Sequence, residues 1–194
     1  MATQFCHAMY KLSHRVGDNW VPHSHKPVYM VDSLGQTRRI LAGIPGGEPA
    51  PFTRLVSCLE PLYFLLYVLH TPRGESAAGR YQSTQVSLEQ FHAFIDRFGA
   101  YLSADSRFDL WAHSPAEQAT VVWDRHNQLF AYGPLDKFAA ELDALGFAEG
   151  NASISFPHQH HYRQEFDADA KTLLSYFSWS YSPLRPEDEQ WKDK

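Results

Sequence analysis

The sequence has little cysteine and no cluster of basic residues, and both features exclude whole classes of protein. Cys6 and Cys58 are its two cysteines in 194 residues, too few for a disulfide framework and too far apart for a zinc knuckle. We therefore expect two free thiols in a reducing cytoplasm. The 17 Lys and Arg residues are scattered among 22 Asp and Glu, and the net charge is −5, so we expect no nucleic-acid partner.

Long hydrophobic runs are also missing. The longest, Leu62 to Leu69, is far shorter than the roughly 20 residues that a membrane helix needs. The amino-terminal segment has no continuous apolar stretch of the kind found in secretory signals. We therefore expect a soluble cytoplasmic protein with no membrane partner. The sequence contains neither a phosphate-binding loop nor a nucleophile elbow, so no motif states its function.

What the sequence does contain is enough apolar surface for a core. Hydrophobic residues make up 44% of the chain and aromatic residues 14%, which argues against extended disorder. The length favours a single domain spanning residues 1–194. Within it we expect a β-rich amino-terminal extension at 1–50, an α+β core at 51–180 and a polar tail at 181–194.

Residue patterns indicate which segments form helices and strands. Ser87 and Gln90 have the spacing of a capping box and precede an apolar stripe of helical period. Residues 62–71 are apolar on both alternating faces, which predicts a central strand covered on both sides. Together the patterns predict main helices at 88–102 and 134–145, a short helix near 52–59 and a terminal helix at 167–177. They also predict an N-terminal hairpin within 27–45 and a main sheet that includes 62–70, 108–113, 119–124, 128–132 and 153–157.

These elements define an expected fold class. From residue 62 onward the order is strand, helix, two or three strands, helix and strand, which resembles the split βαβ arrangement of ferredoxin-like folds. The prediction is an α+β fold with a mixed, mostly antiparallel sheet, helices packed on it, an N-terminal β extension and a C-terminal helix. A ferredoxin-like core is compatible with this order.

Histidines are the most distinctive chemical feature of the sequence. In extended chain His158 and His160 share one face and His161 the other, and His23 and His25 form a second His-x-His pair. Paired imidazoles suit Zn²⁺, Fe²⁺ or Ni²⁺, and Glu165 or Asp167 could add a carboxylate. We therefore predict a metal site from these two pairs and Glu165 if the two segments meet. The alternatives are a metal-free acid–base role and plain hydrogen bonding at strand ends.

The segment GDNWVPHSH, residues 17–25, resembles the opening of the cupin metal motif, in which a glycine is followed after five residues by His-x-His. His158, His160 and Glu165 resemble the later part of that motif. No glutamate follows His25 at the expected offset, and the second cupin motif is absent. The strong helical patterns further along the chain do not suit a β-barrel. We therefore transfer no cupin function to this chain.

Two other segments are candidates for chemistry. The loop from Thr71 to Arg80 follows an apolar strand, and Arg73 and Arg80 could clamp a small anionic ligand through a carboxylate or phosphate. A solvated loop is the alternative. Asp124 and His126 invite comparison with an Asp–His dyad, but no serine or cysteine is placed for activation, so we interpret them as part of a tight turn.

Two classes of function remain open. The first is a binding, regulatory or immunity-type accessory domain without catalysis, whose partner would be a protein or a small anion. The second is a metal-dependent hydrolase or oxygenase that uses the His-x-His pairs. We expect the first, because the sequence shows no complete catalytic constellation, and the second is the alternative.

Overall fold

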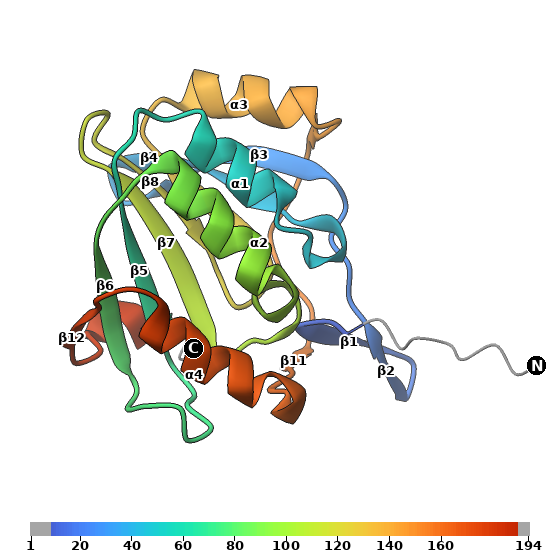
Figure 1. Ribbon diagram of the computed structural model, residues 1–194. Helices are drawn as coiled ribbons and strands as arrows, with labels where there is room; N and C mark the ends of the chain where they lie inside the picture. Colours follow the sequence, from blue (N-terminus) through green and yellow to red (C-terminus); the bar gives the residue numbers. More distant parts are fainter. Residues whose placement is uncertain (1–8, 190–194) are drawn as a thin grey trace, which may run out of the picture.

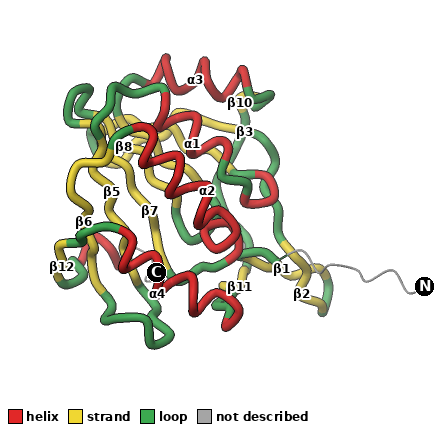
Figure 2. Tube along the Cα trace, viewed as in Figure 1, coloured by secondary structure: helices red, strands yellow, loops and turns green. Residues whose placement is uncertain are grey.

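The computed structural model describes residues 9–189 and has the predicted α+β architecture (Figure 1). Four α-helices lie on one face of a large sheet, and a small second sheet lies beside it (Figures 1 and 2). The order of the large sheet is β10-β3-β4-β9-β8-β7-β5-β6-β12. Its strands are β3 (Val28–Leu34), β4 (Thr37–Gly43), β5 (Tyr63–Leu69), β6 (Gly79–Val86), β7 (Phe108–Ser114), β8 (Ala119–Trp123), β9 (Gln128–Tyr132), β10 (Ala148–Glu149) and β12 (Ser180–Ser182).

The sheet is mixed and mostly antiparallel, as the sequence predicts. Only the short pairing of β10 with β3 is parallel. The predicted hairpin at 27–45 is present as β3 and β4, which meet at Gly35 with φ of 61°, a conformation that glycine adopts without strain. Both strands are full members of the large sheet. The ferredoxin-like core is not confirmed by this strand order.

The helices bury the predicted apolar stripes. They are α1 (Ala50–Ser57), α2 (Leu88–Ala104), α3 (Leu135–Ala144) and α4 (Asp167–Tyr176). The Ser87 hydroxyl accepts from the Gln90 backbone N–H, and the Gln90 side chain accepts from the Ser87 N–H, so the capping box at the start of α2 is complete. The main core lies between these helices and the sheet and includes Phe52, Phe91, Phe94, Phe98, Phe108 and Phe138.

The opposite face of the sheet is only partly covered, which corrects the expectation for residues 62–71. In β5 the alternate residues Tyr63, Leu65, Tyr67 and Leu69 are fully buried under the helices. Leu66, on the other face, is only half-buried. That face carries a smaller apolar cluster of Leu41, Val122, Phe130 and Ala152. It therefore leaves room for the cavity described below.

The last predicted strand is displaced from 153–157. Residues 153–157 have no strand pairing, and the pairing is made instead by β11 (His158–His160). Pro157 lacks a backbone N–H and cannot donate to a ladder. β11 pairs with β1 (Leu12–Val16), which in turn pairs with β2 (Asn19–Pro22), to form the small sheet. The sequence also failed to predict β6, whose first two residues were assigned to a polar loop.

Other expectations concern the termini and the thiols. No helix within residues 9–189 is both long and apolar enough to cross a membrane. Cys58 is a half-buried free thiol, and Cys6 lies outside the described residues, as do residues 190–194 of the predicted tail.

Candidate metal centre and its cavity

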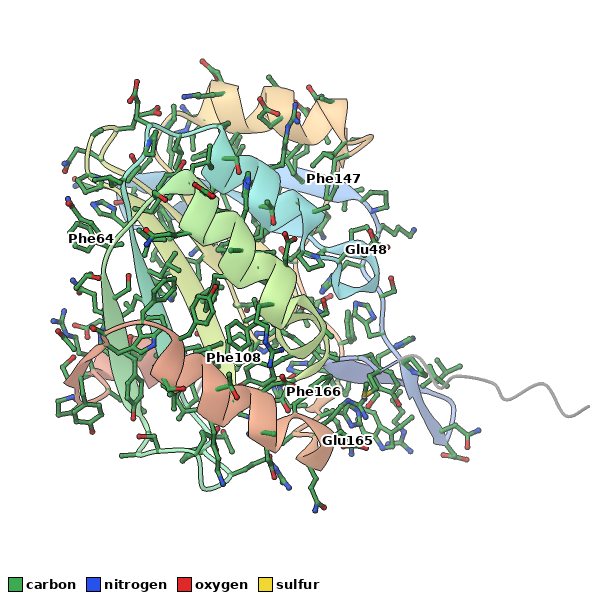
Figure 3. All side chains as sticks on the ribbon, viewed as in Figure 1. Glu48, Phe64, Phe108, Phe147, Glu165 and Phe166 are labelled. Atoms are coloured by element: carbon green, nitrogen blue, oxygen red, sulfur yellow. The ribbon has the colours of Figure 1, made fainter. Side chains whose placement is uncertain are left out.

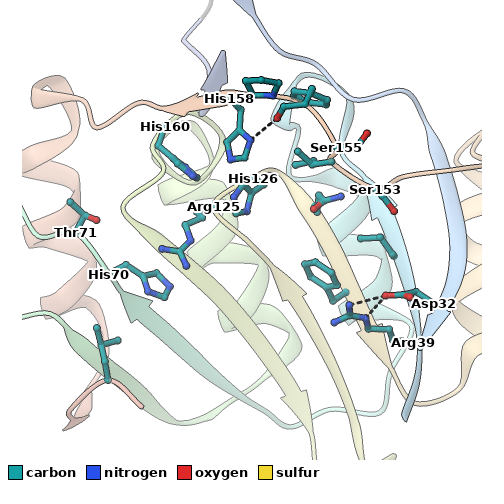
Figure 4. Close-up of a pocket in the computed structure, with 17 residues that line it drawn as sticks. Asp32, Arg39, His70, Thr71, Arg125, His126, Ser153, Ser155, His158 and His160 are labelled. Atoms are coloured by element: carbon teal, nitrogen blue, oxygen red, sulfur yellow. Dashed lines mark hydrogen bonds and ion pairs between the residues drawn. The ribbon is translucent and has the colours of Figure 1, made fainter. Parts of the chain in front are cut away.

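Three histidines from two distant segments meet at the edge of the partly covered face of the large sheet. His126 lies in the turn between β8 and β9, and His158 and His160 lie on β11. One ring nitrogen from each residue lies within 4.8 Å of the others. Figure 4 shows the three imidazoles side by side, with His158 and His160 on one face of β11 as the alternation of a strand predicts. The structure therefore has a three-histidine group, which includes two of the predicted ligands.

The Asp124 carboxylate orients the His126 ring by bonding its Nδ1. His126 Nδ1 donates to Asp124 Oδ2 over 2.6 Å. The other carboxylate oxygen accepts the backbone N–H groups of His126 and Gln128, both at 2.8 Å. Because Nδ1 carries the proton in this arrangement, Nε2 presents the lone pair that a metal would use. A carboxylate behind a ligating histidine is the usual companion of a metal site.

The Asp124 carboxyl is ionised despite its burial. Burial alone raises its pKa, but the nearby His126 imidazole, the hydrogen bonds and the buried Lys11 ammonium outweigh that effect and lower the pKa to about 2. Lys11 Nζ donates to the Asp124 carbonyl over 3.0 Å, while its own pKa is lowered by burial to about 8. The aspartate is thus a fixed anion next to His126.

His158 is also oriented as a lone-pair donor, and His160 is neutral. His158 Nδ1 donates to the Phe156 carbonyl over 3.1 Å, which leaves Nε2 as the basic nitrogen. The buried Nδ1 of His160 has no hydrogen-bond partner among residues 9–189. Burial and the neighbouring His126 and His158 lower the pKa of His160 to about 3. A neutral, orphaned imidazole nitrogen is costly to bury without a ligand.

The second predicted pair, His23 and His25, lies beside this group but is not part of it. His25 Nε2 donates to the His126 carbonyl over 2.8 Å. His23 Nε2 lies 3.5 Å from His25 Nδ1, and its ring packs against Phe156 at 4.6 Å between centroids. The two segments therefore do meet in space, and the pair braces the turn that carries His126. Ligation by His23 or His25 stays a prediction.

The structure places the other predicted site residues, Glu165, Arg73 and Arg80, outside the three-histidine group. Glu165 is exposed in the 3-10 turn at Gln164–Phe166 that leads into α4, and it does not belong to the three-histidine group (Figure 3). Arg73 pairs with Asp167 at 3.0 Å, and Arg80 pairs with Asp188. Both guanidinium groups are thus neutralised by this chain, and ligand binding by them stays a prediction.

A buried ion-pair network fixes the chain as it leaves β11. The Arg107 side chain is fully buried and bonds both carboxylate oxygens of Asp105 at 2.9 Å. The same two residues hold the Arg163 backbone, since Arg107 donates to its carbonyl and Asp105 accepts its N–H, each at 2.8 Å. Because Arg163 follows His160 by three residues, this network positions the strand that carries two of the three histidines.

A cavity of about 1080 Å³ opens in front of the three histidines. Its floor is the partly covered face of the sheet, and its rim is the segment 153–157 (Figure 4). Arg39 lines it and is paired with Asp32 at 2.8 Å. His70 also lines it, with Nε2 bonded to Asp109 at 2.8 Å. The volume is that of a site for a small molecule.

The donor set fits a tetrahedral metal after a small contraction. Zn–N bonds of about 2.0–2.1 Å place tetrahedral ligand nitrogens about 3.3 Å apart, so any pair at the 4.8 Å limit must close by about 1.5 Å. Small changes in imidazole side-chain torsions supply such a movement. Three neutral imidazoles with an outer carboxylate match zinc better than a hard, oxygen-seeking cation.

His126 was not predicted as a ligand from the sequence, although it forms the group together with His158 and His160. The signal was present in the Asp124-x-His126 spacing, because the turn that directs the Asp124 carboxylate to nearby N–H groups also directs it to the imidazole. What the sequence lacked was the position of that turn against β11.

Comparison of the chain with family models, with curated proteins and with solved structures gave no match.

Proposed function

We propose that the protein is a metal-dependent hydrolase, with a zinc-class ion held by His126, His158 and His160. The observation that carries the proposal is the three-histidine group with the Asp124 carboxylate 2.6 Å behind His126. Catalytic zinc sites use three protein ligands and keep a position open for water. All three histidines line the cavity, so an open position would face a bound substrate.

The donor set favours a hydrolase over an oxygenase. Non-haem iron oxygenases use two histidines and one carboxylate, whereas no carboxylate belongs to the group found among residues 9–189. When bound, the metal would lower the pKa of a coordinated water and polarise a carbonyl or phosphoryl oxygen. Asp124 would hold the His126 ring in place.

Elemental analysis of untagged protein tests the metal part of the proposal. We expect close to one transition-metal ion per chain in the wild type and loss of that ion in a His158→Gln/His160→Gln double variant. His92→Gln is the matched control, because His92 is exposed on α2 and bonds Ser57 there. Absence of metal from wild-type protein that has been offered zinc and cobalt would overturn the proposal.

Hydrolysis is tested with the reconstituted protein. A panel of chromogenic carboxylate and phosphate esters should show turnover that is removed by a chelator, restored by zinc and lost in the double variant. Cobalt substitution gives a visible spectrum that reports tetrahedral coordination independently of turnover.

A second candidate is a binding or regulatory domain without catalysis. It is favoured by the lack of a free carboxylate base at the site, since the one carboxylate that lines the cavity among residues 9–189, Asp32, is paired with Arg39. Stoichiometric metal without turnover on any ester would favour this candidate, in which the metal is structural or the cavity only holds a ligand.

A further inference from the structure

The arginine next to the three-histidine group differs from the other shielded arginines of the structure. Arg125 is half-buried and lines the cavity, yet its guanidinium makes no hydrogen bond or ion pair within residues 9–189. Each of the other arginines there that are not exposed bonds acceptors of this chain, namely Arg39, Arg80, Arg107 and Arg163. A guanidinium has five N–H donors, and a partly buried one that bonds no acceptor of the protein is available to bind an external anion.

The backbone holds Arg125 in place. Its N–H donates to Asp109 Oδ1 over 2.8 Å, and its carbonyl accepts from the Ser106 hydroxyl over 3.2 Å. Residue 125 precedes His126, whose ring is fixed by Asp124. Figure 4 shows the Arg125 side chain extending into the cavity between His70 and His126. The guanidinium is therefore presented from a fixed turn and not from a mobile loop.

No carboxylate among residues 9–189 forms an ion pair with the Arg125 guanidinium. The Asp109 carboxylate already accepts from His70 and from the Arg125 backbone, and Asp124 is engaged by His126 and Lys11. The cavity wall around Arg125 adds further polar groups, since His70 and the Thr71 side chain lie on the same side in Figure 4. An oxyanion placed there would meet a positive charge and several potential hydrogen-bonding groups.

We propose that the cavity binds a small molecule through a carboxylate or phosphate group held by Arg125, with the remainder of that molecule lying over His126, His158 and His160. This inference rests on the proposed function for the identity of the reacting end, but the anion subsite itself needs no metal. The substrate class is therefore a small ester that carries an anionic group. Its oxyanion end is recognised at Arg125, and its ester end lies at the histidines.

Calorimetric titration of inorganic phosphate and of acetate into metal-free protein at low ionic strength tests the subsite. Wild type should bind at least one of the two anions, and Arg125→Gln should weaken that binding about tenfold or more, the effect of losing a charge-assisted hydrogen bond. Arg38→Gln is the matched control, because it removes the same charge from an exposed position of β4. Acetamide, which has no charge, should not bind.

Further measurements separate this inference from the metal proposal. Arg125→Gln should keep the circular dichroism spectrum and the metal content of wild type, which shows that the variant is folded and the histidines intact. No anion binding by wild type, or equal binding by wild type and Arg125→Gln, would overturn the inference even if zinc is present. Anion binding that depends on Arg125 in a protein that takes no metal would support the subsite and remove the hydrolase proposal.

Discussion

At the scale of single residues, Asp124 is the residue outside the three-histidine group that most directly fixes the geometry of the candidate site. It is an ionised carboxylate inside the protein, and it bonds His126 at both the ring and the backbone. An outer carboxylate fixes the ring and makes its other nitrogen more basic. Its removal should therefore weaken metal binding without removing a ligand.

The variant Asp124→Asn tests this role. We expect zinc affinity, measured by competition with a chromophoric chelator, to fall by about 10–100-fold. Asp32→Asn is the control, since Asp32 also lines the cavity but contacts Arg39, and it should leave the affinity unchanged. Equal affinities for the two variants would show that Asp124 serves the turn alone.

At the scale of elements, β11 depends on the buried Arg107–Asp105 pair. The strand has only three residues, and β1 is its one sheet neighbour. The pair bonds the Arg163 backbone just beyond the strand. Removal of one partner of a buried pair leaves an uncompensated charge, whereas removal of an exposed partner costs little.

Arg107→Met should therefore lower the free energy of unfolding by about 3–5 kcal/mol. Arg97→Met is matched to it, because Arg97 forms an exposed pair with Asp169, and it should cost at most about 1 kcal/mol. Urea unfolding measures both. Similar losses in the two variants would mean that the buried pair contributes no more to stability than the exposed pair.

The elements also show what sequence can predict. Local signals predicted α2, because its capping box and apolar stripe lie within a single stretch of chain. β11 was placed too early because its pairing partner, β1, lies at the other end of the sequence, and no local pattern reveals such pairing. For the same reason His158 and His160 were predicted as candidate ligands while His126 was not.

At the scale of the whole molecule, buried neutral histidines make stability depend on pH. The pKa of His160 is lowered to about 3 and that of His23 to about 4, in both cases chiefly by burial. The unfolded chain binds protons below about pH 6.5, where the folded protein does not. The stability that these residues contribute is complete above pH 6.5 and is lost as the pH falls toward 4.

Thermal unfolding of the metal-free protein between pH 7 and 4 measures this dependence. We expect the melting temperature to fall steadily over that interval, and a His23→Gln/His160→Gln variant to have a shallower profile than wild type. Parallel profiles would show that other groups control the acid sensitivity.

The pairing of β1 with β11 has a consequence for the order in which this molecule forms. His161 bonds Ser13 across 148 positions of sequence. β11 can therefore pair with β1 only after residue 160 has left the ribosome. A nascent chain that ends before residue 158 can pair β3 with β4 and β5 with β6, but it contains at most one of the three histidines. The protein would therefore acquire its capacity for metal after most of the large sheet has been synthesised.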